Sequence, residues 1–77
     1  MNKRSEFCEK DTIRITYTDD TVCFEDMKTA ESVLFNNSGD VLHSNFDSSK
    51  TAYFKSYFNQ IISSIITLRN LDGLETA

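Results

Sequence analysis

The side chains that offer a thiol or an imidazole, as thiol catalysis and zinc binding require, are few: two cysteines and one histidine. Cys8 and Cys23 form no Cys-x-x-Cys pair, and the single histidine, His43, cannot complete a zinc site with them. His43 could in principle activate a cysteine, but it falls on the outward side of an expected strand, where a solvated histidine is far commoner. We therefore expect neither a bound metal nor a thiol enzyme.

Other metal-binding and catalytic motifs are incomplete or absent in the sequence. The run Asn36-x-Ser38-x-Asp40 has the spacing of the first ligands of a calcium loop, but Val41 stands where such a loop needs glycine. The chain carries no glycine-rich phosphate loop, no Gly-x-Ser-x-Gly and no His-Glu-x-x-His. We expect a protein that is not an enzyme and that needs no cofactor.

Carboxylates are the one group gathered in the sequence. The chain has 12 acidic and 8 basic residues, and residues 19–47 hold seven of the acids against one lysine. A pair among them could act as general acid and base, although solvated turn carboxylates are the commoner case. The alternative to a mere solubilising surface is a docking surface for a basic protein. Its candidate residues are Asp19, Asp20, Glu25, Asp26, Glu31 and Asp40.

Size and composition limit the remaining possibilities. A chain of 77 residues, 39% hydrophobic and 26% charged, fits one globular domain near the lower size limit for independent folding. We see no secretory signal and no run of eighteen apolar residues, so we expect a cytoplasmic protein with reduced cysteines and no membrane association. The net charge of −4 argues against direct binding of nucleic acid.

The element that must organise the fold is a long amphipathic helix over 50–71. Asp47, Ser48 and Ser49 are candidate N-caps, and Gly73 is a candidate residue just past its end. Large apolar residues recur at steps of three and four, which places them on one broad face: Phe54, Phe58, Ile61, Ile65 and Leu68, with Tyr53 and Tyr57 toward its flank. The two flanking tyrosines are candidate partner-binding residues. The same face also fits a heptad seam, through which two copies could pair as a homodimer.

An antiparallel hairpin is predicted ahead of this helix. Residues 12–18 alternate between apolar and polar, and Asp19-Asp20 can form a two-residue turn. This register sets Tyr17 opposite Val22, Ile15 opposite Phe24, Arg14 opposite Glu25 and Thr16 opposite Cys23, with Cys23 on the outer face away from Cys8. Arg14 and Glu25 would then form an opposite-charge pair.

The middle of the chain allows two interpretations. The preferred one is a helix capped by Asp26, with Met27, Ala30, Val33 and Leu34 buried; the other makes 32–36 a strand that turns at 37–39 into the next strand. A strand over 40–46 follows, with Leu42 and Phe46 facing inward. The expected architecture is a two-layer α+β domain of β-β-α-β-α order over 11–71, or the ββββα meander, with a flexible arm at 1–10 and a flexible tail at 72–77.

These features favour a small intracellular protein-binding module that docks its acidic surface on a basic, nucleic-acid-handling partner protein. In size, charge and lack of motifs the chain resembles phage- and plasmid-encoded inhibitors of such proteins, although no residue motif supports a family. The alternative is a homo-oligomeric assembly module joined through the long helix.

Overall fold

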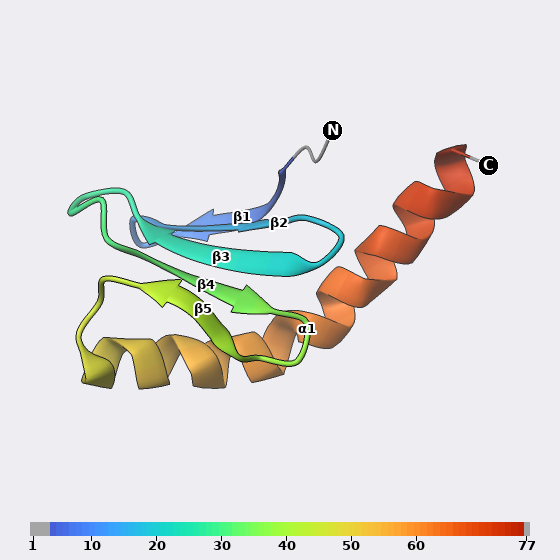
Figure 1. Ribbon diagram of the computed structural model, residues 1–77. Helices are drawn as coiled ribbons and strands as arrows, with labels where there is room; N and C mark the ends of the chain where they lie inside the picture. The colour runs from blue at the N-terminus through green and yellow to red at the C-terminus, as the bar shows by residue number, and fades with distance from the viewer. Residues whose placement is uncertain (1–3, 77) are drawn as a thin grey trace.

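The computed structural model describes residues 4–76 and shows a two-layer α+β domain (Figure 1). Five antiparallel strands pair in chain order, so the sheet is a meander. The strands are β1 (Ser5–Lys10), β2 (Ile13–Tyr17), β3 (Thr21–Asp26), β4 (Ser32–Asn36) and β5 (Val41–Ser44), and the single helix is α1 (Ser48–Thr76). The first part of α1 lies along one face of the sheet, and its C-terminal part projects past the strands (Figure 1).

The predicted hairpin is confirmed as β2 and β3. Every expected pair is present, including Tyr17 opposite Val22 and Thr16 opposite Cys23. The Thr18 backbone N–H donates to the Thr21 carbonyl at 2.9 Å and closes the turn around Asp19 and Asp20. The alternation decides this register because a slip by one residue would move every apolar side chain to the solvent face.

The helix expected between Asp26 and Asn36 is wrong, and the meander interpretation is the one the structure takes. Asp26 does cap a turn: its Oδ1 accepts the backbone N–H groups of Lys28 and Thr29 at 2.9 and 3.2 Å. The turn then ends at Ala30, which has a left-handed φ of 65°, and β4 pairs with β3. An aspartate cap is found at the start of a helix and in a turn alike, and the short apolar run that follows fits both a helix and a strand. The sequence therefore could not decide between the two interpretations.

The arm expected at residues 1–10 is largely a strand, since β1 pairs with β2 from Ser5 to Lys10. A bulge between Glu6 and Cys8 shifts the register, so the simple alternation that marks a strand is broken in the sequence. Residues 1–3 of this arm lie outside the described residues.

The long helix is confirmed and runs further than expected. Asp47 is its N-cap, because Asp47 Oδ1 accepts the Lys50 backbone N–H at 2.8 Å. At the other end α1 continues past Gly73 to Thr76, so most of the expected tail is helical; residue 77 lies outside the described residues.

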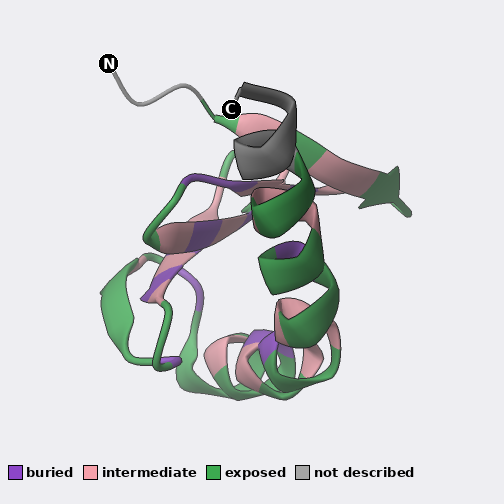
Figure 2. Cartoon of the chain, turned by 90° about the vertical axis from the view of Figure 1, so that its right-hand side faces the viewer, coloured by how far each residue is buried: buried purple, intermediate pink, exposed green. Residues whose placement is uncertain are grey.

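The core lies between this helix and the covered face of the sheet. Buried positions alternate along the strands and recur along α1 (Figure 2). They are Ile15, Tyr17, Val22, Phe24, Val33, Phe35, Phe46, Phe54, Phe58 and Ile65. The rings of Phe24 and Phe35 meet edge to face at 5.7 Å, and Phe54 packs on Phe24 at 5.2 Å. The candidate heptad seam is therefore used to close the domain.

Leu42 departs from its expected inward position, and its side chain is 53% exposed. Val41 pairs with Phe35 and His43 pairs with Leu34, so Leu42 falls in a bulge without a strand partner.

Candidate protein-docking surface

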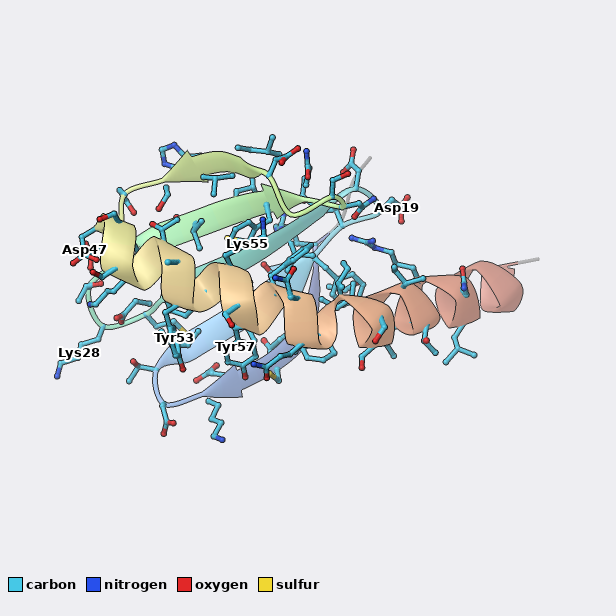
Figure 3. The ribbon with its side chains drawn as sticks, turned by 90° about the horizontal axis from the view of Figure 1, so that it is seen from below. Asp19, Lys28, Asp47, Tyr53, Lys55 and Tyr57 are labelled. Carbon is cyan, nitrogen blue, oxygen red and sulfur yellow. The ribbon has the colours of Figure 1, made fainter. Side chains whose placement is uncertain are left out.

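The fold divides the candidate acidic residues between the two ends of the sheet. Asp19, Asp20 and Asp40 lie in the β2–β3 and β4–β5 turns, at what we call the Asp19 end. Asp26 at the end of β3 and Glu31 in the β3–β4 turn lie at the opposite end, which also carries Asp11 in the β1–β2 turn and Asp47 at the start of α1; we call this the Asp11 end. The length of β3, about 20 Å at 3.3 Å per residue, separates the two ends. Figure 3 shows Asp19 and Asp47 at opposite ends of the sheet.

Cations from α1 tie down the Asp19 end. Arg69 donates from Nε to the Thr18 carbonyl at 2.8 Å and from Nη2 to the Thr21 carbonyl at 3.2 Å. Its Nη1 donates to Asn37 Oδ1 at 2.8 Å. Lys55 Nζ donates to the Gly39 carbonyl at 2.7 Å. The turns of this end therefore have two cationic side chains bonded to their backbone and are held against the helix.

The Asp11 end is built from two turns bonded to each other. The Met27 backbone N–H donates to the Thr12 carbonyl at 2.9 Å, which joins the β3–β4 turn to the β1–β2 turn. Lys28 lies in the β3–β4 turn. Met27 and Tyr53, at this same end, are 49% and 63% exposed. Large apolar side chains are thus open to solvent among carboxylates.

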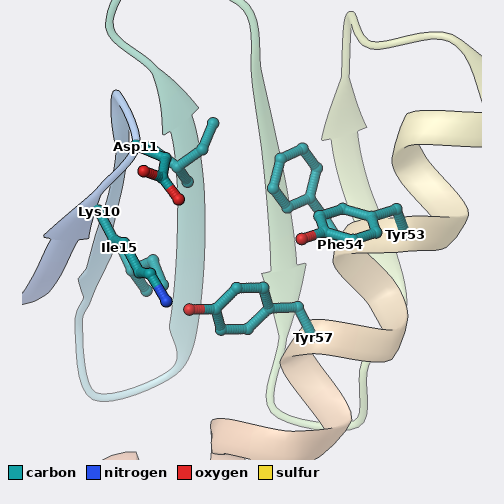
Figure 4. Close-up of a pocket in the computed structure, with 7 residues that line it drawn as sticks. Lys10, Asp11, Ile15, Tyr53, Phe54 and Tyr57 are labelled. Atoms are coloured by element: carbon teal, nitrogen blue, oxygen red, sulfur yellow. The ribbon is translucent and has the colours of Figure 1, made fainter.

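Both candidate tyrosines of α1 line a groove at this end. Its volume is about 110 Å³, and its walls are Lys10 and Asp11 from the β1–β2 turn and Tyr53 and Tyr57 from the helix. The floor consists of Ile13, Ile15 and Phe54. An adjoining hollow of about 300 Å³ shares Lys10 and both tyrosines and continues along α1 to Gln60. Figure 4 shows the Lys10 amine and the Tyr57 hydroxyl pointing toward one another across the groove.

The uncovered face of the sheet holds the remaining candidate carboxylate, Glu25, which is exposed. Although Arg14 lies opposite Glu25 as predicted, its ion pair is with Glu6 of β1, at 3.2 Å from Nε to Oε1. The expected neutralisation of Glu25 by Arg14 is therefore wrong, because β1 was not foreseen as a neighbour. Glu25 lies toward the Asp11 end but not in its turns.

The two cysteines are free and lie on opposite faces, as predicted. Cys8 packs at the margin of the core. Burial raises the pKa of the Cys23 thiol, against the opposing effect of the nearby Arg4 guanidinium. A raised pKa keeps Cys23 in the thiol form at neutral pH, which is the less nucleophilic state.

Other kinds of site were sought over the part of the chain that the structure describes. There, no three His, Cys, Asp or Glu side chains are grouped so that they could hold a metal ion. Within the same residues, α1 lacks an apolar stretch long enough to cross a bilayer. Comparisons with known protein families, with curated proteins and with solved structures find no match to this chain.

Sequence reasoning did not single out Lys10, Asp11 or Arg69, and it wrongly expected Met27 to be buried, although all four shape the two ends. Lys10 and Asp11 were assigned to an arm and to its junction with the first strand. Recognising residues 5–10 as a bulged strand would have turned Asp11-Thr12 into a second hairpin turn beside the aromatic flank of the helix. Arg69 was counted only as a charge on the helix.

Proposed function

We propose that this protein is a small protein-binding module that docks on a basic surface of another protein through its Asp11 end. The observation that carries the proposal is the combination found there: exposed Met27 and Tyr53, a groove beside Tyr57, and four carboxylates in the adjoining turns and at the helix start. Protein interfaces commonly join an apolar centre that contains aromatic residues and methionine to a polar rim.

Electrostatics support a basic partner. The chain carries a net charge of −4, so long-range attraction speeds its encounter with a positive surface and repels it from negative ones. A basic protein surface that is otherwise used to hold nucleic acid offers such a charge pattern. Occupying it would make the module an inhibitor or an adaptor of a nucleic-acid-handling protein, and nucleic acid would compete with it for the partner.

The Asp19 end is a weaker candidate because two cations of α1, Arg69 and Lys55, bond to the backbone of its turns and bring positive charge there. Hydrogen bonds of the carboxylates do not separate the two ends: Asp20 and Asp40 accept from Thr18 and Asn36, just as Asp26 and Glu31 accept from Lys28 and Thr29. Self-association through the helical seam is weaker still, since Phe54 and Phe58 would have to leave the core. We therefore propose that the docking surface lies at the Asp11 end.

Two matched variants test the assignment. One replaces Asp11→Asn, Asp26→Asn and Glu31→Gln at the Asp11 end; the other replaces Asp19→Asn, Asp20→Asn and Asp40→Asn at the Asp19 end. Both remove three negative charges, and each new amide keeps a carbonyl oxygen that can accept the turn hydrogen bonds.

Tagged wild type and both variants are used to capture partners from a lysate of the source cells at low and at high salt. We expect one basic partner that the wild type and the Asp19-end variant retain, that the Asp11-end variant loses, and that high salt or added nucleic acid releases. Equal loss by both variants would mean that only net charge matters. A partner retained by the Asp11-end variant would refute the proposed surface.

A further inference from the structure

The groove between the β1–β2 turn and the aromatic flank of α1 has walls of two different kinds. One wall is the pair of tyrosine rings, Tyr53 and Tyr57, and the other carries Lys10 and the Asp11 carboxylate (Figure 4). We propose that this groove receives an arginine side chain of the basic partner. This inference rests on the proposed function and names the group that the Asp11 end recognises.

The tyrosine wall suits a cation. The centroids of the Tyr53 and Tyr57 rings are 6.4 Å apart and their planes meet at 82°, which is an edge-to-face contact, so the two rings form one continuous aromatic wall of the groove. Tyr53 is 63% exposed, which leaves its ring open to an incoming group. Ring faces carry negative electrostatic potential and attract cations, and the attraction grows as water is excluded.

Asp11 supplies the charge that such a cation needs. Its carboxylate lies in the turn that forms the facing wall, and Figure 4 shows it directed toward the groove. A carboxylate facing aromatic rings binds a positive group and repels a negative one. The other carboxylates of the Asp11 end add to this preference, so we favour a cationic occupant over a carboxylate or a phosphate.

The floor favours arginine among the cations of proteins. Ile13, Ile15 and Phe54 present apolar surface below the charged rim, and the methylene stem of a long side chain can cover it. A guanidinium is planar, is more weakly hydrated than an ammonium, stacks on aromatic rings and can pair with a carboxylate through two hydrogen bonds. Lysine offers the stem but only a strongly hydrated point charge.

Lys10 is the resident cation of this groove. Its amine points toward the Tyr57 hydroxyl in Figure 4, so the protein itself places a positive group where the guanidinium would lie. Lys10 is exposed, and its side chain can swing into solvent when a guest enters. The incoming arginine must displace it, so removing the Lys10 charge strengthens binding.

A titration of the full chain with small capped amino acids tests the groove without any partner protein. The probes are N-acetyl-arginine methylamide, the lysine analogue and the uncharged norleucine analogue, followed by NMR at the side chains of Tyr53, Tyr57 and Ile13. We expect saturable shifts at these residues with arginine, weaker binding of lysine and no saturable shift with norleucine. A response to norleucine equal to that to arginine, or no saturable shift with arginine, would overturn the inference.

Three variants sharpen the titration. Asp11→Asn should weaken arginine binding about two- to fivefold, the range of a partly exposed ion pair. Asp11 has a φ of 53°, which asparagine tolerates, so the turn is kept. Asp19→Asn, with the same charge change at the far end, should leave the affinity unchanged. Lys10→Gln should tighten arginine binding about twofold, and weaker arginine binding by the Lys10→Gln protein would refute the inference.

The arginine groove and the docking function of the Asp11 end can be refuted independently of each other. If the arginine probe does not bind but the Asp11-end variant still loses the captured partner, the arginine groove is wrong and the docking surface stands. If the probe binds with the expected variant pattern but the captured partner ignores the Asp11-end substitutions, the groove stands and the proposed docking function is wrong.

Discussion

The two ends of the sheet carry similar numbers of carboxylates but are built in opposite ways. At the Asp19 end, Arg69 and Lys55 reach from α1 to backbone carbonyls of both turns, and Asn37 Nδ2 bonds the Asp19 carbonyl at 3.3 Å. At the Asp11 end the turns bond to each other, and the exposed apolar side chains of Met27 and Tyr53 stand beside them.

Backbone conformation separates the ends as well. Among the described residues, the non-glycine residues with positive φ are Asp11, Thr12 and Ala30, and all three lie in turns of the Asp11 end. The positive φ at the Asp19 end belongs to Gly39, the residue type that adopts it without strain. The turns of the Asp19 end thus place glycine where a positive φ is needed, whereas the Asp11 end holds non-glycine residues in this less favourable backbone region.

The largest effect on folding is expected from Arg69→Met. The substitution keeps an apolar stem but removes the guanidinium that holds two carbonyls and Asn37. Hydrogen bonds from a charged donor contribute about 1.5–3 kcal/mol each when buried, and these are partly exposed, so we expect a total loss of about 2–3 kcal/mol. Urea unfolding measures it, with Lys50→Met as the control at an exposed site. Equal stability of the two variants would show that the Asp19 end is not held by Arg69.

A smaller loss, about 1–2 kcal/mol, is expected from Gly39→Ala. Gly39 has a φ of 87°, where an L-residue is strained. An added Cβ would also lie 3.0 Å from Lys55 Cε and 3.2 Å from Phe58 Cε1. Ser38→Ala in the same turn is the control and should change the free energy of unfolding by less than about 0.5 kcal/mol. A Gly39→Ala protein as stable as that control would contradict the close packing of this turn on the helix.

The comparison also shows what the sequence could predict. The β2–β3 register followed from alternation around a two-residue turn, and the helix and its buried residues Phe54, Phe58 and Ile65 followed from a period of three to four. Both patterns are local and unbroken. Two missed features are ones in which a bulge breaks the pattern, β1 near Phe7 and the exposed Leu42 in β5. The third, β4, pairs regularly with β3 and was missed because its short apolar run fits a helix as well as a strand.

The candidate site was predictable only in part because it depends on which turns become neighbours. Tyr53 and Tyr57 were recognisable from their place on the flank of the helical stripe, and both line the groove. The charge excess of residues 19–47 was correct as a count, but a meander sends successive turns to opposite ends of the sheet. It therefore divides a run of carboxylates that looks continuous in sequence, and it brings Asp11, from outside that run, beside the tyrosines.

The smallest expected change in the free energy of unfolding is a gain, and it comes from a substitution at the Asp11 end. Ala30 has a φ of 65°, so Ala30→Gly relieves about 1–2 kcal/mol of left-handed strain and loses about 0.5–1 kcal/mol to the greater freedom of glycine in the unfolded chain. We expect a net gain of about 0.5 kcal/mol, measured by urea unfolding. Ala52→Gly, at an exposed position inside α1, is the matched control and should cost about 1 kcal/mol.

If both substitutions destabilise the protein alike, the turn at Ala30 holds no strain, and the contrast between an unstrained Asp19 end and a strained Asp11 end fails. If they differ in sign, the Asp11 end retains a residue that lowers stability, as expected where a turn is shaped by what it must present to a partner.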